Sequence, residues 1–253
     1  MAVAPRRAPG CDGSDMDPAE YSVLARRLID NAHDLDALAA ARRMGMADPA
    51  TYALLLEKVA HGTEDRRNAS HWFVEAAAVW STTLRDERRA EAALREAIRT
   101  DPWNERAAER LAQTLDGAGR HDAVLVALEK RAMVCASRIG EVPNGSERLA
   151  AMWVELGRRW SAGQGGRVDR ALVSYERAFS LDPKNLDAIR GVRAMHLRAG
   201  RWPEVIATFE KERMLLRDRS EQITSLREEA SVRKTAGDRA GMVQALRLAH
   251  LLD

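Results

Sequence analysis

The sequence has few of the residues that many folds depend on. Its 253 residues include two cysteines, three phenylalanines and three tyrosines. Cys11 lies in a proline- and glycine-containing start and Cys135 in a helix-like stretch, so the two do not build a disulfide framework. No stretch reaches the roughly 20 apolar residues of a membrane span, and the start has no apolar signal region. We therefore expect a protein of the cytoplasm.

The chain also has no large excess of charge of either sign. The chain has 40 Lys and Arg against 38 Asp and Glu, a net charge of +2, and the two signs are interspersed. A nucleic-acid-binding helical array would need a continuous basic stripe. The balance of charge disfavours a nucleic-acid partner and gives no reason to expect an acidic membrane surface.

Motifs for catalysis and for metal binding are missing as well. The sequence contains no glycine-rich phosphate loop, paired zinc-ligand motif or nucleophile elbow. The nearest approach to a metal cluster is His61, Glu64, Asp65 and His71, but this spacing does not place both histidines on one helical turn. We predict no metal, no cofactor and no catalytic residue, which means that the chain is not expected to be an enzyme.

What the sequence does contain is a repeat. Asp30, Asp101, Asp182 and Asp253 each end a helix-like stretch, at intervals of 71, 81 and 71 positions. The 81-residue copy is lengthened at IGEVPNGSE and SAGQGG, where Ser146 is a candidate N-cap. These insertions form either a contact patch or ordinary tolerated loops. Self-similarity at a fixed period indicates a solenoid.

The clearest unit runs over residues 186–219. Ile189, Val192 and His196 share one face of a first predicted helix, Gly200 ends it, and Pro203 opens the next. The second helix continues the pattern with Val205, Phe209 and Arg213. This spacing predicts two antiparallel helices, whose apolar faces must pack on the helices before and after them.

The residues of the segment 152–184 resemble the tetratricopeptide repeat family, whose units are pairs of helices. The matching positions hold large residues in the first helix and small residues where helices cross: Trp153, Leu156, Gly157, Trp160, Ala171, Tyr175, Ala178 and Pro183. The turn between Trp160 and Ala171 is two residues longer than in the family. The high Arg and Ala content and the double-repeat period resemble large bacterial arrays.

The resemblance implies an all-α fold, a right-handed superhelical solenoid of about six antiparallel helix pairs. It covers residues 18–253 and follows a flexible tail at 1–17. We expect the pairs near 35–61, 69–100, 105–138, 147–182, 186–217 and 220–253. The stretch from Tyr21 to Leu28 is either a first helix or the second helix of an earlier unit, and the aspartate spacing favours the second assignment.

The six tryptophans divide between these positions. Trp80, Trp153 and Trp160 fall where the family has interhelical core, which favours a structural role over stacking on a ligand. Trp103 and Trp202 sit beside helix starts. Trp72 fits neither kind of position, and exposure on the surface is the alternative for this residue.

The resemblance also implies a groove lined by the first helices of the pairs, which in the family commonly holds a peptide. The inward positions of the C-terminal half carry five cations, with Asp187 as the one acid among those that can be placed: Arg158, Arg190, Arg198, Arg227 and Lys234. Arginine can hold carboxylates through two parallel hydrogen bonds, which favours an acidic peptide. The alternative is a basic face that only contacts water.

The predicted function is therefore a non-catalytic scaffold or adaptor for protein–protein interaction. The alternative is a regulatory or substrate-recruiting segment of a larger enzyme or assembly complex. Because the two earlier copies continue after Asp101 and Asp182 with a proline and a further helix, we also expect the array to continue or to self-associate beyond Asp253.

Overall fold

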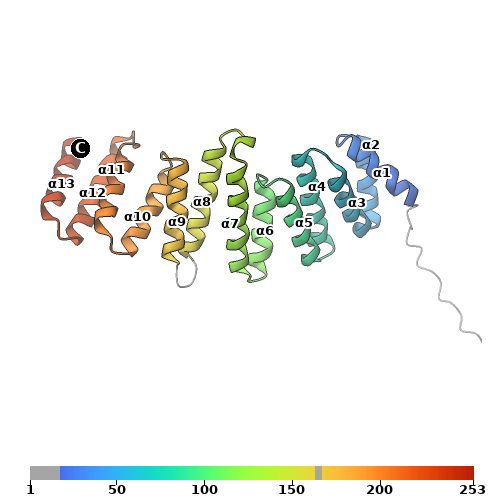
Figure 1. The fold of residues 1–253 in the computed structure, drawn as a ribbon, viewed down its shortest axis with the longest axis horizontal. Helices are drawn as coiled ribbons and strands as arrows, with labels where there is room; N and C mark the ends of the chain where they lie inside the picture. Colours follow the sequence, from blue (N-terminus) through green and yellow to red (C-terminus); the bar gives the residue numbers. More distant parts are fainter. Residues whose placement is uncertain (1–17, 163–166) are drawn as a thin grey trace, which may run out of the picture. The chain divides into compact units, whose positions relative to one another are not determined.

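The structure is a computed structural model that describes residues 18–162 and 167–253. Over these residues the chain forms thirteen α-helices and no β-strand (Figure 1). The predicted all-α class is thus confirmed. The predicted tail at 1–17 and most of the enlarged turn after Trp160 lie outside the described residues.

The chain divides into two compact units, which meet in sequence between Arg120 and His121. The N-terminal unit has a π-helical segment, η1 (Val79–Thr83), between its fourth and fifth helices. Its α-helices are α1 (Pro18–Asp30), α2 (Leu35–Ala47), α3 (Pro49–Gly62), α4 (Arg66–Ala78), α5 (Glu87–Thr100) and α6 (Glu105–Gly117).

The C-terminal unit has one short 3-10 helix, η2 (Ile139–Glu141), after its first α-helix. Its α-helices are α7 (His121–Ser137), α8 (Gly145–Ala162), α9 (Val168–Leu181), α10 (Leu186–Arg198), α11 (Trp202–Arg213), α12 (Arg219–Thr235) and α13 (Arg239–Leu252). Because α8 begins at Gly145, the prediction of Ser146 as its N-cap is wrong.

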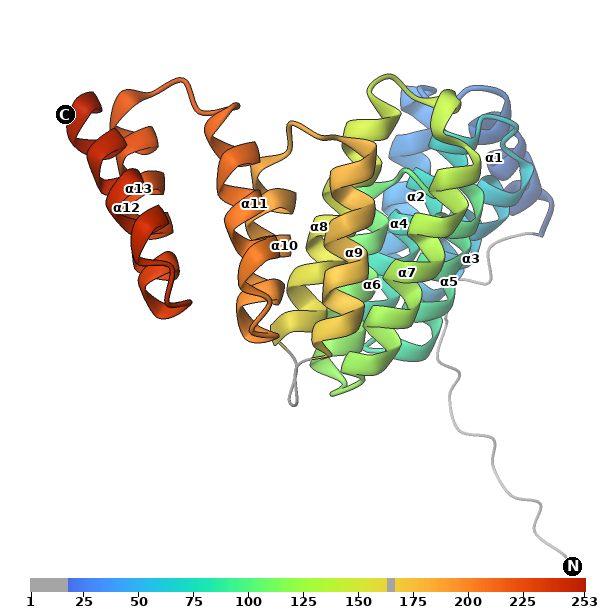
Figure 2. The same cartoon turned by 60° about the vertical axis from the view of Figure 1, so that its left-hand side comes forward.

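Within each unit every helix packs on the next helix in sequence, which is the packing of an α-solenoid (Figures 1 and 2). Helices two apart also touch, as α4 does with α6 and α8 with α10, while α1 contacts both α2 and α3. The predicted pair at 105–138 spans the boundary between the units. That pairing, the place of α1 in the repeat and the right-handed superhelical course all stay predictions.

Three of the four repeated aspartates are helix caps, and the fourth, Asp30, is the last residue of α1. Asp101, Asp182 and Asp253 are the C-cap residues of α5, α9 and α13, and each backbone N–H donates to the carbonyl four residues earlier. The Oδ1 atoms of Asp101 and Asp182 also accept from backbone N–H groups two residues further on, 2.9 and 3.0 Å away. An aspartate is favoured there because its side chain closes the turn that leads to the next helix.

The tryptophans at the predicted core positions are buried. Trp80, Trp153 and Trp160 all lie in the interior, as expected, and the Trp80 indole Nε1 donates to Glu57 Oε1 at 2.7 Å. The prediction that left Trp72 a place on the surface is wrong, because its side chain is only 8% exposed. At the end of α10, Gly200 adopts a φ of +66°, which glycine reaches without the cost that a side chain brings.

Three helices of the C-terminal unit meet around one aromatic ring. Tyr175 of α9 lies against two glycines, Gly157 of α8 and Gly191 of α10. A Cβ atom at Gly157 would stand 2.9 Å from the ring, and one at Gly191 would stand 2.3 Å from it. The glycines therefore set the distance at which α8 and α10 pack on α9.

We expect the substitution Gly191→Ala to destabilise the C-terminal unit. Overpacking a buried site costs about 1–3 kcal/mol. The higher helix propensity of alanine relative to glycine offsets about 1 kcal/mol of this cost. The net loss in unfolding free energy is then up to about 2 kcal/mol, measurable by urea unfolding. Gly117→Ala is the matched control, since a Cβ there would have no neighbour within 4 Å. Equal stability of the two variants would contradict this account of Tyr175.

Candidate functional site

The five predicted peptide-binding residues all lie on every second helix of the C-terminal unit. Arg158 is on α8, Arg190 and Arg198 are on α10, and Arg227 and Lys234 are on α12. All five are exposed to solvent. The resemblance to the tetratricopeptide repeat family thus selects surface residues on alternate helices.

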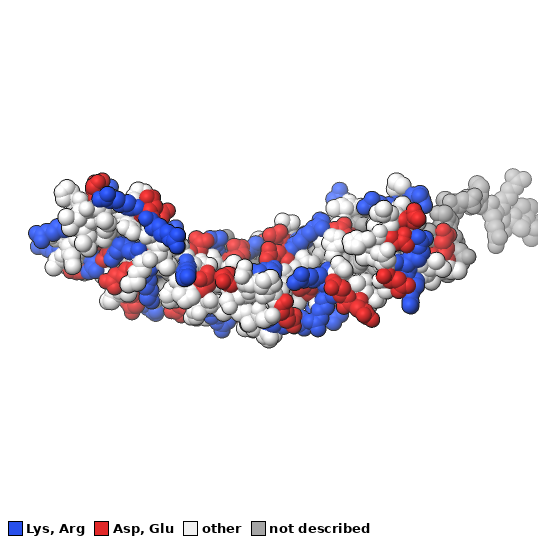
Figure 3. Space-filling model, turned by 90° about the horizontal axis from the view of Figure 1, so that it is seen from above, with Lys and Arg blue, Asp and Glu red and all other residues white. Residues whose placement is uncertain are grey.

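Most of these cations already have partners within the chain. Arg158 forms an ion pair with Asp187 at 2.8 Å, and Arg227 pairs with Asp253 at 3.2 Å. Arg198 Nη1 donates to the Ser161 carbonyl at 2.9 Å. Figure 3 shows the consequence on one face of the molecule, where Lys and Arg side chains lie among Asp and Glu side chains. This face carries both signs of charge, and an acidic ligand would have to compete with the carboxylates that already pair with these arginines.

Arg190 differs from the others because its partner is buried. Its Nε donates to Glu212 Oε1 at 2.6 Å, and Glu212 of α11 is only 2% exposed. The second oxygen of Glu212 accepts from Arg193 Nη1 at 2.5 Å and from Ser225 Oγ of α12 at 3.3 Å. The Arg193 guanidinium also lies over the Phe209 ring, 4.1 Å from its centre. One buried carboxylate thus joins α10, α11 and α12.

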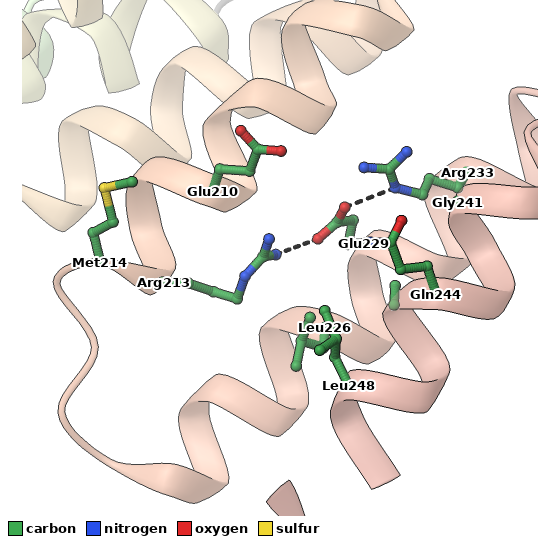
Figure 4. A pocket seen from close by; sticks show the side chains of 10 residues that line it. Glu210, Arg213, Met214, Leu226, Glu229, Arg233, Gly241, Gln244 and Leu248 are labelled. Carbon is green, nitrogen blue, oxygen red and sulfur yellow. Dashed lines mark hydrogen bonds and ion pairs between the residues drawn. The ribbon is translucent and has the colours of Figure 1, made fainter. Parts of the chain in front are cut away.

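A second buried carboxylate lies on α12. Glu229 is 3% exposed and accepts from Arg233 Nε at 2.7 Å and from Arg213 of α11 (Figure 4). Arg233 continues the network, since its Nη1 donates to Asp238 Oδ2 at 2.6 Å. We call the two carboxylates and their partners the charged junction: Arg190, Arg193, Glu212, Arg213, Ser225, Glu229 and Arg233.

Two cavities flank the charged junction. The smaller measures about 290 Å³ and is lined by Arg190, Arg193, Glu212 and residues of α12. The larger measures about 470 Å³, and Figure 4 shows Arg213 and Glu210 of α11 on one side of it and Leu226, Glu229 and Leu248 on the other. These volumes are in the range of ligand pockets, but the arginines and the buried carboxylates in their walls are bound to one another.

The electrostatics of Glu212 follow from its surroundings. Burial by itself raises the pKa of a carboxyl group, since the charged form loses its hydration. The hydrogen bonds from Arg193 and Arg190, together with their charges, outweigh burial and hold the pKa of Glu212 below its usual value. Glu212 is therefore a structural anion at neutral pH.

Sequence reasoning missed the charged junction because a charged helix is normally a solvated one. The spacing of Val205 and Phe209 predicts Arg213 on the apolar face of α11, whereas the fully buried residue is its neighbour Glu212. A signal was present: Glu212 follows Val205 and Phe209 at helical spacing, and Glu229 precedes the buried Ala230. Two acids on buried helix faces imply buried cations beside them.

Two of the residues considered for a metal site have structural contacts in the N-terminal unit. The His61 ring packs edge-on against Phe73, 5.0 Å between centres, and Asp65 caps α4 by accepting from the Asn68 N–H at 2.7 Å. Over residues 18–162 and 167–253 there is no group of three or more His, Cys, Asp or Glu side chains placed to hold a metal ion. Nor does any helix in these ranges have the length and apolar character needed to cross a membrane.

Comparison with known proteins gives only distant likenesses. No family model and no curated protein matches the chain. Among solved structures, one of MamA is 17% identical, covers 69% of this chain and 93% of its own, and has a TM-score of 0.46. A second structure of the MamA protein is 16% identical, with coverages of 72% and 91% and a TM-score of 0.48.

The Cut9–Hcn1 hetero-tetramer of the APC/C is also similar. It is 16% identical, covers 95% of this chain and 48% of its own, and has a TM-score of 0.38. Likenesses at this level carry no argument about function, so the description of the fold depends on the helices and their contacts.

We expect Glu212→Gln to destabilise the chain at pH 7 and much less in acid. Removing the charge leaves Arg193 buried without its counter-ion, and breaking a buried pair costs about 3 kcal/mol or more. Because the pKa of Glu212 is lowered in the folded state, its contribution is complete above the unfolded Glu pKa of about 4.3. This contribution to stability is lost as the pH falls through the pKa that Glu212 has in the folded state, because protonation removes the same charge that the substitution removes.

Urea unfolding followed by circular dichroism at pH 7 and pH 3 measures this difference. The control is Glu155→Gln, which removes the partly exposed pair with Arg159 at 2.9 Å and should cost under about 1 kcal/mol. A gap between wild type and Glu212→Gln that is as large at pH 3 as at pH 7 would show that the charge of Glu212 is not what stabilises the junction.

Proposed function

We propose that the chain is a non-catalytic protein-interaction scaffold of the tetratricopeptide type, which binds an acidic peptide or partner domain. The proposed binding surface comprises the exposed cations of α8, α10 and α12: Arg158, Arg190, Arg198, Arg227 and Lys234. The observation that supports it most is their common placement on alternate helices of one stack. Apart from Leu197 of α10, which is 37% exposed, the large apolar side chains of those helices are buried or half-buried, which leaves mainly charged side chains for a partner.

The internal ion pairs are compatible with this proposal. Arg158 and Asp187 are both more than half exposed, and a pair in that setting contributes only about 0–1 kcal/mol. A carboxylate from a partner could replace Asp187 at small cost, because the guanidinium group keeps the same number of hydrogen bonds. Arg190 is less available, since its loss would leave the buried Glu212 with one arginine partner fewer.

The wider proposal concerns the setting in which this scaffold works. It places the protein in the bacterial cytoplasm, with a protein partner in preference to nucleic acid. It includes a continuation of the array, or self-association, next to α13. The apolar side chains exposed on α13 support this part, because Leu246, Leu248 and Leu251 are available for contact.

Binding of a fluorescein-labelled decaglutamate peptide, followed by anisotropy, tests the charge preference. We expect the triple variant Arg158→Glu, Arg198→Glu, Lys234→Glu to lose at least about tenfold in affinity, since each change replaces an attraction by a repulsion. Arg190 is left unchanged because its loss would disturb Glu212. The charge-matched control is Arg26→Glu, Arg99→Glu, Arg247→Glu, which places the same changes on α1, α5 and α13.

Two results would count against the proposal. If the control triple weakens binding as much as the test triple, the peptide responds to net charge and not to α8, α10 and α12. If the wild-type chain fails to bind the peptide at low salt, the acidic partner is wrong.

A single substitution gives the opposite prediction. Asp187→Asn frees Arg158 from its internal partner and should raise the affinity for the same peptide by roughly twofold to fivefold, in line with the small value of an exposed pair. Glu20→Gln, on α1, removes one negative charge elsewhere and is the control. Unchanged affinity in Asp187→Asn would mean that Arg158 does not contact the peptide.

A further inference from the structure

The buried polar and charged side chains among the described residues are concentrated at one place. The described residues contain nine buried polar or charged side chains, and six of them are on α10, α11 and α12. Both buried acids, Glu212 and Glu229, belong to this set. Elsewhere in the C-terminal unit the helices meet through small and aromatic residues, as α8, α9 and α10 do around Tyr175. The junction between α11 and α12 is therefore held by a different kind of interaction.

The bonds across this junction are few and polar. Ser225 Oγ of α12 donates to Glu212 of α11 at 3.3 Å, and Arg213 of α11 donates to Glu229 of α12. The Gln222 side chain donates to the Leu216 carbonyl at 2.8 Å, and Arg193 of α10 stands 3.9 Å from Glu228 of α12. Every one of these groups can exchange its partner for water once the helices part.

The last two helices have an apolar core of their own. Ile223, Leu226 and Ala230 of α12 form a buried cluster with Ala245 and Ala249 of α13, and Met242 and Leu252 pack against it. Figure 2 shows α12 and α13 side by side as one hairpin, next to the hairpin of α10 and α11. Parting α12 from α11 would leave this cluster intact.

Water also has a way into the junction. The cavities of about 290 and 470 Å³ lie on its two sides, and the walls of each include one of the two buried carboxylates. Both cavities are partly open to solvent, so the polar groups in their walls can be hydrated when the helices begin to part.

We propose that α12 and α13 open together, as one unit, at the charged junction, while α8, α9 and α10 stay packed. Opening exposes Glu212, Glu229 and their arginines to water, which hydrates them, and keeps the contacts between α12 and α13 within the apolar cluster. The ionised carboxylates hold the closed state, because each accepts two charge-assisted hydrogen bonds from arginines. Removing one carboxylate charge shifts the balance towards the open state, since a buried guanidinium loses its counter-ion.

Hydrogen exchange on the full chain, resolved by mass spectrometry of peptides, tests the proposal. In the wild type we expect the amides of α12 and α13 to exchange with a common protection factor, lower than that of α8 and α9. Glu229→Gln should speed exchange in α12 and α13 alike by more than about tenfold, and leave α8 and α9 unchanged. Glu210→Gln is the control: this acid borders the same cavity, is exposed, and has no bond to the arginines drawn in Figure 4.

Three outcomes would overturn the proposal. In the first, α13 keeps its protection while α12 loses it, which is local fraying. In the second, exchange rises equally in α8 to α13, which is unfolding of the whole unit. In the third, Glu229→Gln behaves like Glu210→Gln. If Glu229→Gln fails to fold, as judged by circular dichroism, the wild-type pattern decides, because unequal protection of α12 and α13 already excludes opening as one unit.

Discussion

Each helix in this protein depends on the helices next to it in sequence. A helix of 13 or 14 residues is marginal in water by itself, so its apolar stripe must be covered by neighbours. Here those neighbours are the preceding and following helices of the same unit. Small residues at the crossings make this possible, as Gly157 and Gly191 do beside Tyr175. Stability in such a stack is a sum of interfaces, and each interface has its own strength.

The charged junction follows from the same constraint. An interface can be closed by carboxylates and guanidinium groups if every charge finds a partner, and Glu212 and Glu229 each find two. Such an interface contributes less to the free energy of unfolding than an apolar one, because both charged groups lose their hydration when it closes. The result is a stack whose helices are joined firmly around Tyr175 and less firmly between α11 and α12. A partner that binds α8, α10 and α12 together would stabilise the weaker interface between α11 and α12, because it would contact helices on both sides of it.

Much of the fold could be predicted from the sequence because its signals are local. The aspartates that recur at 71 and 81 residues close helix ends through bonds to their own neighbours. The burial of Trp80, Trp153 and Trp160 follows from their positions in a helix pair. The burial of Trp72 and the start of α8 at Gly145 depend on packing at positions that the family pattern does not assign, and the predictions for both were wrong.

The candidate site was harder to predict. The resemblance to the tetratricopeptide repeat family placed five cations on the first helices of the pairs, but it could not show that Arg158 meets Asp187 or that Arg190 meets Glu212. These pairs join residues 29 and 22 positions apart, and whether a charge is free or bound depends on which helix lies opposite. The charged junction was missed for the same reason, since Glu212 is an ordinary surface acid until α10 and α12 cover it.

The central claim is that stability is transmitted from one helix to the next and not through a shared core. Hydrogen exchange in a Tyr175→Ala variant of the full chain tests it most directly. The account predicts faster exchange in α8, α9 and α10, with an effect that declines through α11 to α13. Equal acceleration in every helix from α7 to α13 would contradict it, because it would mean that the C-terminal unit unfolds around a single cooperative core.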